Sequence, residues 1–417
     1  MAKLPTREDL TKDADLCVKC GVCLPHCPTF ALHNDETESP RGRIALVQGL
    51  ANNQLSPTPK VRESLDHCLS CGRCESVCPA QVPYSRLMDG ARFILPTTPA
   101  RTVRKRRLTA RLLKSPRILR ILAQLARMFR RTGLHKAFGP DSAAGRTIAW
   151  LPESITIARH TLPVNAGATA LIFPGCLTSA FEQDIVDCAV RIGERLGVVW
   201  QEPQKSLCCA GLYQHMGEHA ATGSLMTMAV DELAAHPHLP IATVLSGCGK
   251  SLRENLAGAD TRRAAQVRER LVDIHTLLLQ SFDRKFEPVF APAREPVAVY
   301  LPCSISAGQQ QHLIRLLNHV PGAQVHVISR GFGCCGAAGD NMTTYPDTAD
   351  ALVEPLITEA VGLGVSRILI PNLGCAWHWR ANLRRRNAPI TVCHPLQWLG
   401  AHLKTNDHAG AGAIING

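Results

Sequence analysis

The second half of the chain alternates short apolar runs with longer amphipathic stretches. Apolar runs at residues 169–173, 297–301 and 368–370 each end just before a proline, and a cysteine follows shortly after. In other stretches apolar residues recur every three or four positions, which predicts helices over 181–196 and 309–319. Alternating strands and helices of this kind are typical of a parallel sheet covered by helices.

The same pattern occurs twice within residues 166–417. Four cysteines recur 126 or 127 residues apart, and His275 recurs as His394. So constant an offset predicts two homologous α/β modules, 166–290 and 291–417. We expect their thiols at the carboxyl edges of two facing sheets, where helix dipoles stabilise thiolate. The equivalent cysteines are Cys176 with Cys303, Cys208 with Cys334, Cys209 with Cys335, and Cys248 with Cys375.

Residues 1–95 are predicted to be mainly helical. Ser39 before Pro40 is typical of a helix N-cap followed by the first helical residue. The apolar spacing that follows predicts a helix over 40–51, and a second helix is predicted over 59–67.

Two cysteine runs within this segment share one spacing. Each reads C-x2-C-x2-C-x3-C-P, the arrangement that holds cubane [4Fe–4S] clusters in two-cluster ferredoxins. Three thiolates come from one run and the fourth comes from the partner run, so the two runs must fold together. We assign Cys17, Cys20, Cys23 and Cys78 to the first cluster, and Cys68, Cys71, Cys74 and Cys27 to the second.

Zinc and disulfides are the alternatives for these cysteines. Structural zinc sites favour two CxxC pairs separated by a loop, so two complete runs ending in Cys-Pro fit zinc poorly. A disulfide framework fits poorly too, because the chain is long and residues 1–16 have no apolar signal sequence. The 40 residues between Cys27 and Cys68 favour a helical ferredoxin arrangement over a minimal strand-built one.

Residues 96–165 connect the two halves and hold the excess positive charge. The formal net charge is +12, residues 101–136 carry thirteen Lys and Arg, and residues 90–140 include no acidic residue. Ser115-Pro116 predicts a helix that ends near Arg131, with arginines on one face and apolar residues on the other. Three interpretations of this helix are open. It could lie on an anionic membrane surface, dock onto an acidic partner subunit, or pack on its own protein with a solvated basic face. Nucleic-acid binding is disfavoured, because the segment has almost no aromatic residues.

Several further residues near these motifs have expected roles. Arg41 and Arg43 either offset the negative charge of a cluster or begin an exposed helix. His26 and His67 are expected at the surface, with tuning of a cluster as the alternative. Roles in the packing of the fold are expected for Cys188, Cys393, His275, His394, Trp377, His378 and Trp379.

Residues 166–417 resemble the pair of cysteine-rich (CCG) domains found in heterodisulfide reductases. The likeness rests on a lone cysteine, a cysteine pair after 31 or 30 intervening residues, and a last cysteine after 38 or 39 intervening residues more. That family has a further cysteine three positions before the last, where this chain has Leu245 and Asn372. The first copy also reads Cys-Cys-Ala-Gly in place of Cys-Cys-Gly. Each module keeps four thiols, either for a cluster or for redox chemistry.

The complete chain resembles the iron–sulfur subunits of glycolate oxidases. It has Ser-Pro-Arg-Gly-Arg between two cysteine runs and two CCG modules behind them, which is a specific combination. The motifs that carry the likeness are CVKCGVC at 17–23, CPT at 27–29, SPRGRI at 39–44, DHCLSC at 66–71, CP at 78–79, SGCG at 246–249 and CCG at 334–336.

This resemblance implies an electron-transfer subunit of a glycolate or other 2-hydroxy-acid dehydrogenase complex. Its cofactors would be two [4Fe–4S] clusters, with a further iron–sulfur cluster in the CCG modules as an open question. An FAD-binding oxidase subunit would oxidise the substrate, and electrons would pass through this chain towards the quinone pool. No G-x-G-x-x-G opens a helix after a strand, so neither a flavin or NAD site nor a catalytic residue is expected here.

Two other functions stay open. The iron–sulfur subunit of anaerobic glycerol-3-phosphate dehydrogenase has the same layout, and a heterodisulfide-reductase-like enzyme would use the CCG cysteines directly in thiol–disulfide chemistry. Because no apolar run reaches the ~18 residues of a spanning helix, we expect a cytoplasmic protein. The basic residues 101–136 would then meet the quinone pool or the membrane surface, with the chain peripheral on the inner face of the cytoplasmic membrane.

Overall fold

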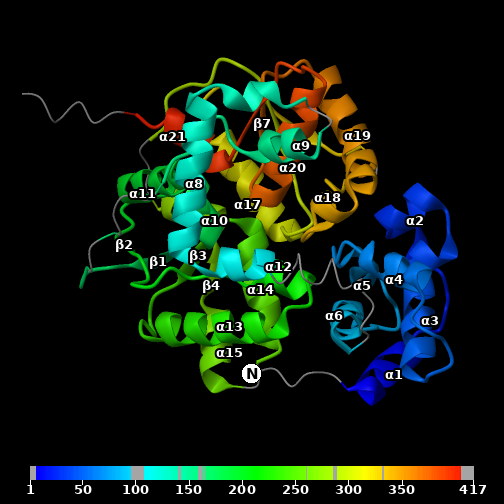
Figure 1. Ribbon diagram of the computed structural model, residues 1–417. Helices are drawn as coiled ribbons and strands as arrows, with labels where there is room; N and C mark the ends of the chain where they lie inside the picture. The colour runs from blue at the N-terminus through cyan, green and yellow to red at the C-terminus, as the bar shows by residue number, and fades with distance from the viewer. Residues whose placement is uncertain are drawn as a thin grey trace, which may run out of the picture.

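The computed structural model describes residues 6–94, 108–139, 142–157, 162, 165–259, 261–284, 289–330 and 333–404. A helical N-terminal region lies beside two α/β modules, each built around a four-stranded parallel sheet (Figure 1). The predicted multidomain α+β architecture is therefore confirmed. The basic residues 101–107 lie outside the described residues.

The N-terminal region is a group of short helices around its own apolar core. Ser39 caps α3, because its Oγ accepts a hydrogen bond from the backbone N–H of Gly42. Val47, Leu87 and Met88 are fully buried where α3 and α6 meet. The two helices predicted here are confirmed as α3 and α4. The helices are α1 (Arg7–Asp15), α2 (Pro28–His33), α3 (Pro40–Ala51), α4 (Pro59–Asp66), α5 (Arg73–Ser76) and α6 (Tyr84–Ile94), with 3-10 turns η1 (Leu24–His26) and η2 (Glu36–Glu38).

The two modules share one strand order, which confirms the duplication. The first sheet runs β2-β1-β3-β4, and the second runs β6-β5-β7-β8, with every neighbouring pair parallel. The strands are β1 (Ala170–Phe173), β2 (Trp200–Gln201), β3 (Ile241–Thr243), β4 (Leu271–Asp273), β5 (Val297–Tyr300), β6 (Val325–Ile328), β7 (Arg367–Leu369) and β8 (Thr391–Cys393).

Helices cover both faces of each sheet. The predicted helix over 181–196 is α11, which begins at Gln183 because α10 ends at Phe181, and the predicted helix over 309–319 is α17. The first module contains α10 (Cys176–Phe181), α11 (Gln183–Arg195), α12 (Gly211–His215), α13 (His219–Ala234), α14 (Ser246–Ala257), α15 (Arg262–Glu269) and α16 (Ile274–Phe282). The second contains α17 (Ala307–Asn318), α18 (Asn341–Thr344), α19 (Pro346–Gly362), α20 (Leu373–Arg385) and α21 (Pro395–Ala401).

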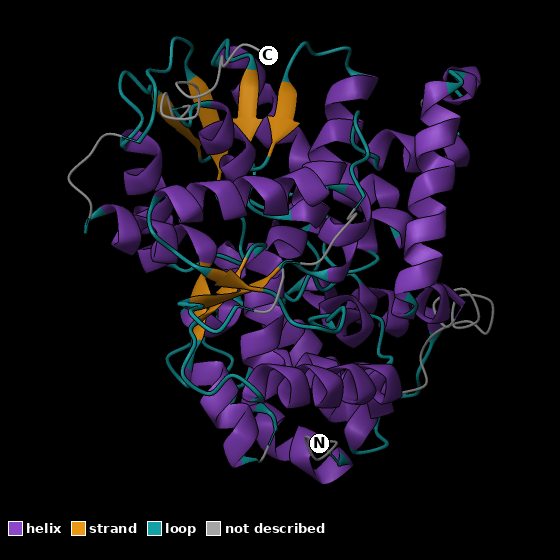
Figure 2. Cartoon of the chain, turned by 90° about the vertical axis from the view of Figure 1, so that its left-hand side faces the viewer, coloured by secondary structure: helices purple, strands orange, loops and turns teal. Residues whose placement is uncertain are grey.

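The modules pack through a shared layer of helices between the two sheets. Figure 2 shows the sheets in orange, one above the other, with helices between them. Helices α11, α16, α17 and α21 contribute the buried residues of this layer. His275 and His394 stack here with ring centroids 5.6 Å apart, and both are buried. Equivalent residues of the two copies therefore meet, and the predicted structural role of both histidines is confirmed.

A buried ion pair also links the modules. Glu182, between α10 and α11, accepts two hydrogen bonds from the guanidinium of Arg380 on α20, at 2.6 and 2.8 Å. Trp377 donates its indole N–H to the same carboxylate at 2.7 Å and packs edge-on against Phe181. The predicted packing role of Trp377 is therefore confirmed, and it lies at the boundary between the two modules.

The connector contains α8 (Pro116–Arg131), η3 (Leu134–Ala137) and α9 (Ala143–Trp150). Ser115 caps α8 as predicted, because its Oγ accepts from the backbone N–H of Ile118. Figure 1 shows α8 standing upright along both modules, and its buried residues Leu119 and Ala123 pack with α10. Within the described ranges, no helix is both long enough and apolar enough to cross a bilayer.

The Glu182–Arg380 pair predicts a large stability effect. Changing Arg380 to Ala leaves a buried carboxylate without its partner, so we expect a loss of about 3–5 kcal/mol of unfolding free energy. The midpoint of thermal unfolding, followed by circular dichroism, measures the loss. Arg263→Ala is the matched control, because the Arg263–Asp231 pair is exposed and its loss costs less than about 1 kcal/mol. Equal midpoints for the two variants would contradict the role of the buried pair.

Candidate metal centres

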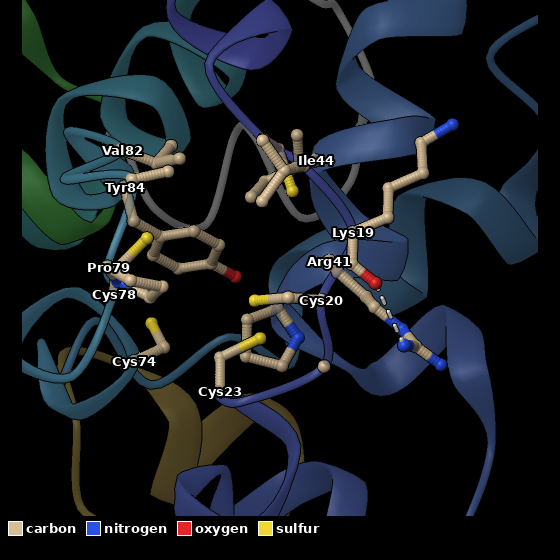
Figure 3. A pocket seen from close by; sticks show the side chains of 15 residues that line it. Lys19, Cys20, Cys23, Arg41, Ile44, Cys74, Cys78, Pro79, Val82 and Tyr84 are labelled. Atoms are coloured by element: carbon tan, nitrogen blue, oxygen red, sulfur yellow. Dashed lines mark hydrogen bonds between the residues drawn. The ribbon is translucent and has the colours of Figure 1, made fainter.

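The first group of thiols lines one pocket in the N-terminal region. Figure 3 shows Cys20, Cys23, Cys74 and Cys78 pointing towards one another, beside the ring of Tyr84. The pocket is lined by Cys17, Cys20, Cys23 and Cys78, and also by Cys74. The fold thus brings Cys78 from the second run to the three thiols of the first, which is the combination that the sequence assigns to one cluster.

The second group lines a neighbouring pocket. Cys74 and Tyr84 line both pockets, so the two groups lie next to each other. Both runs use the same backbone: Lys19 and Gly21 have φ of 55° and 85°, and the equivalent Ser70 and Gly72 have 46° and 75°. These left-handed turns direct successive cysteines to one side of each loop. The second pocket contains the other assigned set, Cys27, Cys68, Cys71 and Cys74.

The chemistry of these thiols fits a group that brings positive charge. Burial raises the pKa of Cys71 to about 12, and burial also raises the pKa of Cys74 far above its usual value. A buried thiolate is therefore stable here only beside a cation that offsets its lost hydration. Four convergent thiols and this requirement together match the donor set of an iron–sulfur cluster.

A buried network supports the second pocket. Arg43 donates from Nη2 to Glu38 at 2.6 Å and from Nη1 to Thr29 Oγ1 at 2.9 Å, and that nitrogen lies 3.9 Å from Cys27 Sγ. Glu38 also pairs with His67 at 3.0 Å. The exposed-helix interpretation of Arg43 and the surface placement of His67 are therefore wrong, because both side chains are buried.

Arg41 and His26 fit their expectations better. Arg41 is partly exposed, pairs with Glu36 at 2.7 Å, and donates to the carbonyl of Lys19 in the first loop. It lines the first pocket, so its charge lies close to that thiol set. His26 is exposed, as expected.

Tyr84 is a site residue that the sequence did not reveal. Its buried hydroxyl lies 3.7 Å from Cys68 Sγ, and the residue lines both pockets. It begins α6, a few residues after Cys78-Pro79, and no spacing marks a tyrosine there as different from an ordinary core residue.

The third set of thiols belongs to the first module. Cys176 begins α10 and Cys248 lies in the first turn of α14, each just after a strand, as expected. Cys176 and Cys208 have their sulfur atoms 3.5 Å apart. Hydrogen bonds from the thiols of Cys208 and Cys248 lower the pKa of Cys209 well below its usual value. The four thiols of this module therefore interact as one group.

The fourth set belongs to the second module. Cys335 and Cys375 have sulfur atoms 2.7 Å apart, and the hydrogen bond from the Cys375 thiol lowers the pKa of Cys335 to about 7. Cys334 is buried beside them, whereas Cys303 is exposed. His378 on α20 bonds to the carbonyl oxygen of Cys335 at 2.6 Å. His378 is therefore attached to a thiol-bearing loop, in addition to the packing role expected for it.

The structure explains where the modules depart from the CCG pattern. Gly336 has φ of 72°, and a Cβ there would lie 2.5 Å from the carbonyl oxygen of Ala349. Ala210 holds the equivalent left-handed conformation with φ of 60°, so both modules make the same turn after the cysteine pair. Asn372, at the position of the missing cysteine, caps α20 by accepting from the backbone N–H of Cys375. With Leu245 and Asn372 in place of the family's further cysteine, each module offers four thiols.

The carboxyl edges of the two sheets adjoin, but the eight cysteines form two sets. Ser246, after β3, bonds to Ser304, after β5, at 2.8 Å and to the carbonyl of Pro371, after β7, at 3.0 Å. Among the described residues, the sulfur–sulfur contacts fall within a module. The prediction that the carboxyl edges of the two sheets face each other is confirmed. The eight thiols form one set of four at each edge.

The second cysteine run docks against the second module. Arg73 donates to the carbonyl of Gly333 at 3.0 Å, next to Cys334. The thiols of Cys71 and Cys303 are close enough that their repulsion adds to burial in raising the pKa of Cys71. The second pocket and the fourth thiol set are thus neighbours.

Lys250 strengthens this junction from the first module. It lies on α14, two residues after Cys248, and its ammonium approaches the carbonyls of Ser70 and Cys71 at 3.4 and 3.3 Å. One cation therefore reaches from the third thiol set to the loop of the second pocket. Neither Lys250 nor Arg73 stands out in the sequence, because their partners are 179 or more residues away.

Comparison with known proteins matches both parts of the chain. Residues 13–82 match the 4Fe-4S dicluster domain, and residues 170–253 and 297–380 each match the Cysteine-rich domain. The chain is similar to the glycolate oxidase iron-sulfur subunit of Escherichia coli (strain K12), with 28% identity over 87% of this chain and 88% of the relative. It is 26% identical to a probable glycolate oxidase iron-sulfur subunit of Bacillus subtilis (strain 168), over 88% and 89%.

A heterodisulfide reductase is among the more distant relatives. One subunit of the dihydromethanophenazine:CoB–CoM heterodisulfide reductase of Methanosarcina barkeri (strain Fusaro / DSM 804) is 20% identical, over 84% of each chain. The resemblances that the sequence suggested, to glycolate oxidase subunits and to heterodisulfide reductases, are both confirmed.

The Tyr84 hydroxyl predicts a measurable electronic effect. Tyr84→Phe removes a hydrogen-bonding group next to Cys68 without changing the packing of the ring. If the hydroxyl donates to the sulfur, we expect a reduction potential about 20–60 mV more negative for the centre in the second pocket. A redox titration followed by electron paramagnetic resonance (EPR) measures this. Tyr213→Phe, in the first module, is the control, and an unchanged potential in Tyr84→Phe would rule out donation to Cys68.

Proposed function

We propose that this chain, which matches a 4Fe-4S dicluster domain and two Cysteine-rich domains, is the electron-transfer subunit of a complex that oxidises glycolate or a similar 2-hydroxy acid. An FAD-binding partner subunit would oxidise the substrate, and a quinone would receive the electrons. The observation that carries this proposal is that the thiol sets are neighbours. The two pockets share Cys74 and Tyr84, and Cys71 of the second pocket lies near Cys303 of the second module.

The proposal gives each thiol set a role. A bound iron–sulfur cluster accepts and releases electrons one at a time. We propose that the two pockets of residues 1–95 hold one [4Fe–4S] cluster each, and that modules 166–290 and 291–417 hold a further iron–sulfur group at their thiol sets. The proposed ligands are Cys17, Cys20, Cys23 and Cys78; Cys27, Cys68, Cys71 and Cys74; Cys176, Cys208, Cys209 and Cys248; and Cys303, Cys334, Cys335 and Cys375.

Other residues of the chain would tune and insulate these sites. Arg43 places a buried positive charge near Cys27, while Glu38 neutralises part of that charge and holds the guanidinium in position. Lys250 and Arg73 fix the second cysteine loop against the two modules. A fixed junction keeps neighbouring sites at constant separation. The residues thus support electron transfer without acting on the substrate.

Co-purification tests the proposed complex. We expect the tagged chain, expressed in its native host, to retain an FAD-containing subunit, and glycolate to reduce the preparation anaerobically, seen as bleaching of the iron–sulfur absorbance. Lactate and glycerol-3-phosphate are the comparison substrates. A retained partner that oxidises glycerol-3-phosphate and not glycolate would replace this proposal with a glycerol-3-phosphate dehydrogenase subunit.

Ligand variants test the exchange of cysteines between the two runs. If Cys78 belongs with the first run, Cys78→Ser should alter the same EPR signal as Cys20→Ser. Likewise, Cys27→Ser should alter the same signal as Cys71→Ser, because these thiols line the second pocket. The opposite grouping, with Cys78 matching Cys71, would show that each run ligates its own cluster.

Iron analysis tests the sites in the modules. Two cubane clusters account for about eight iron atoms per chain, so the proposal predicts more than that in anaerobically purified protein. Serine substitution of Cys208, Cys209, Cys334 and Cys335 should lower the count while leaving the EPR signals of residues 17–78 in place. A count of about eight that does not change in this variant would confine the metal to the N-terminal region.

A further inference from the structure

Helix α8 presents an apolar ridge to the outside of the molecule. Ile121, Leu125 and Met128 are 54%, 57% and 63% exposed, and Leu122 beside them is 39% exposed. Residues spaced by three or four share one face of a helix, so these side chains form one continuous strip. We call these four residues the outer ridge. Leu134 and Phe138, beyond the end of the helix, are also exposed, at 59% and 44%.

The outer ridge is not the face by which α8 packs on its own protein. Leu119 and Ala123 are the buried residues of α8, and they pack with α10 and Ile155. On the same inner side, Arg130 donates to the carbonyls of Ile148 and Leu151. Helix α8 therefore packs on its own protein through Leu119 and Ala123, as one of the three interpretations has it, but most of its large apolar side chains point outwards.

Arginines border the ridge along one edge. Arg117, Arg120 and Arg131 are exposed, and no ion pair to a carboxylate is seen for them among the described residues. Residues 90–140 contain no acidic side chain, so nothing in this segment offsets that charge. An exposed strip of leucine-like side chains flanked by exposed arginines is the pattern of a helix that lies in a membrane interface.

We propose that the outer ridge of α8 binds the chain to the surface of an anionic phospholipid bilayer. The apolar side chains would enter the boundary between headgroups and acyl chains, and the bordering arginines would pair with lipid phosphates. An acidic protein surface would satisfy the arginines but would leave Ile121, Leu125 and Met128 without an apolar partner at the centre of the strip. An apolar strip with a cationic border therefore favours a lipid surface over an acidic protein surface.

This inference does not depend on the proposed redox role. It assigns a surface, and the surface lies on a helix that contributes no cysteine to the thiol sets. If both hold, the electron-transfer sites would be kept beside the bilayer in which a quinone dissolves.

Vesicle binding tests the proposal with the full-length chain. We expect the purified chain to co-sediment with vesicles of phosphatidylcholine containing roughly one-third phosphatidylglycerol, and much less with phosphatidylcholine alone. Binding should weaken as salt rises, since headgroup attraction is screened. The triple variant Ile121→Asp, Leu125→Asp and Met128→Asp should bind at least about tenfold more weakly.

Matched variants separate binding through the ridge from the effect of changing charge elsewhere on the surface. Arg117→Gln, Arg120→Gln and Arg131→Gln together should reduce binding by roughly tenfold or more. Arg262→Gln with Arg263→Gln, at exposed positions of α15, should not. Met228→Asp with Val361→Asp controls for charge at exposed apolar positions elsewhere, because these residues are 39% and 49% exposed. Circular dichroism checks that each variant is folded.

A second measurement uses a single tryptophan on the exposed ridge, where the substitution should leave the fold intact. Met128→Trp places an indole on the ridge, and brominated lipids should quench its fluorescence, while Met228→Trp should be unaffected. Absence of binding to anionic vesicles, or equal binding of the ridge variant, would overturn the proposal. It would also be overturned if the ridge variants lost the co-purifying flavoprotein while the unmodified chain ignored vesicles, which would make the ridge a protein interface.

Discussion

The centres of this protein depend on left-handed turns that aim neighbouring cysteines into one pocket. In each N-terminal run, the residue before the second cysteine and the residue after it have positive φ, and one of the two is not glycine. Lys19 and Ser70 hold this conformation at a cost of about 1–2 kcal/mol each. A similar turn follows each cysteine pair in the modules, at Ala210 and Gly336. The same backbone device therefore recurs at all four thiol sets, on otherwise different scaffolds.

Crowding thiols in this way has an electrostatic consequence. Burial raises the pKa of Cys71 and Cys74, while donation from neighbouring thiols lowers the pKa of Cys209 and Cys335. A set of buried sulfur atoms cannot become fully deprotonated without a cation. Arg43, buried near Cys27, and Lys250, at the carbonyl of Cys71, place positive charge near these thiols. Such sets are therefore suited to holding a cationic metal group.

The duplicated modules are equivalent in fold and unequal in position. They share strand order, the turn after the cysteine pair and the stacked His275 and His394. Among the described residues, the second module brings the thiol of Cys303 near enough to Cys71 for electrostatic repulsion, whereas the first reaches the junction through Lys250. The connector adds another difference, because α8 packs on α10 of the first module and leaves its outer ridge exposed. Duplication therefore produced two similar sites with different neighbours.

Much of the site could be predicted from the sequence, because ligand spacing within one loop is local information. The runs at 17–28 and 68–79 indicate iron–sulfur chemistry by themselves, and the constant offset of the module cysteines indicates the repeat. Ser39-Pro40 and Ser115-Pro116 located two helix starts for the same reason, since caps involve residues a few positions apart.

Only the tertiary structure decided which groups surround those thiols. Tyr84 lies beside the thiol of Cys68, and Lys250 and Arg73 bond to backbone carbonyls of cysteine loops more than a hundred residues away. Burial of Arg43 and His67 depends on Glu38 and Ser64 meeting them in space. The sequence also could not show which face of α8 packs on the protein. Periodicity shows that a helix has an apolar face, but not whether that face meets the protein or the outside. Covalent spacing determined the chemistry of this chain, and packing determined the environment in which that chemistry operates.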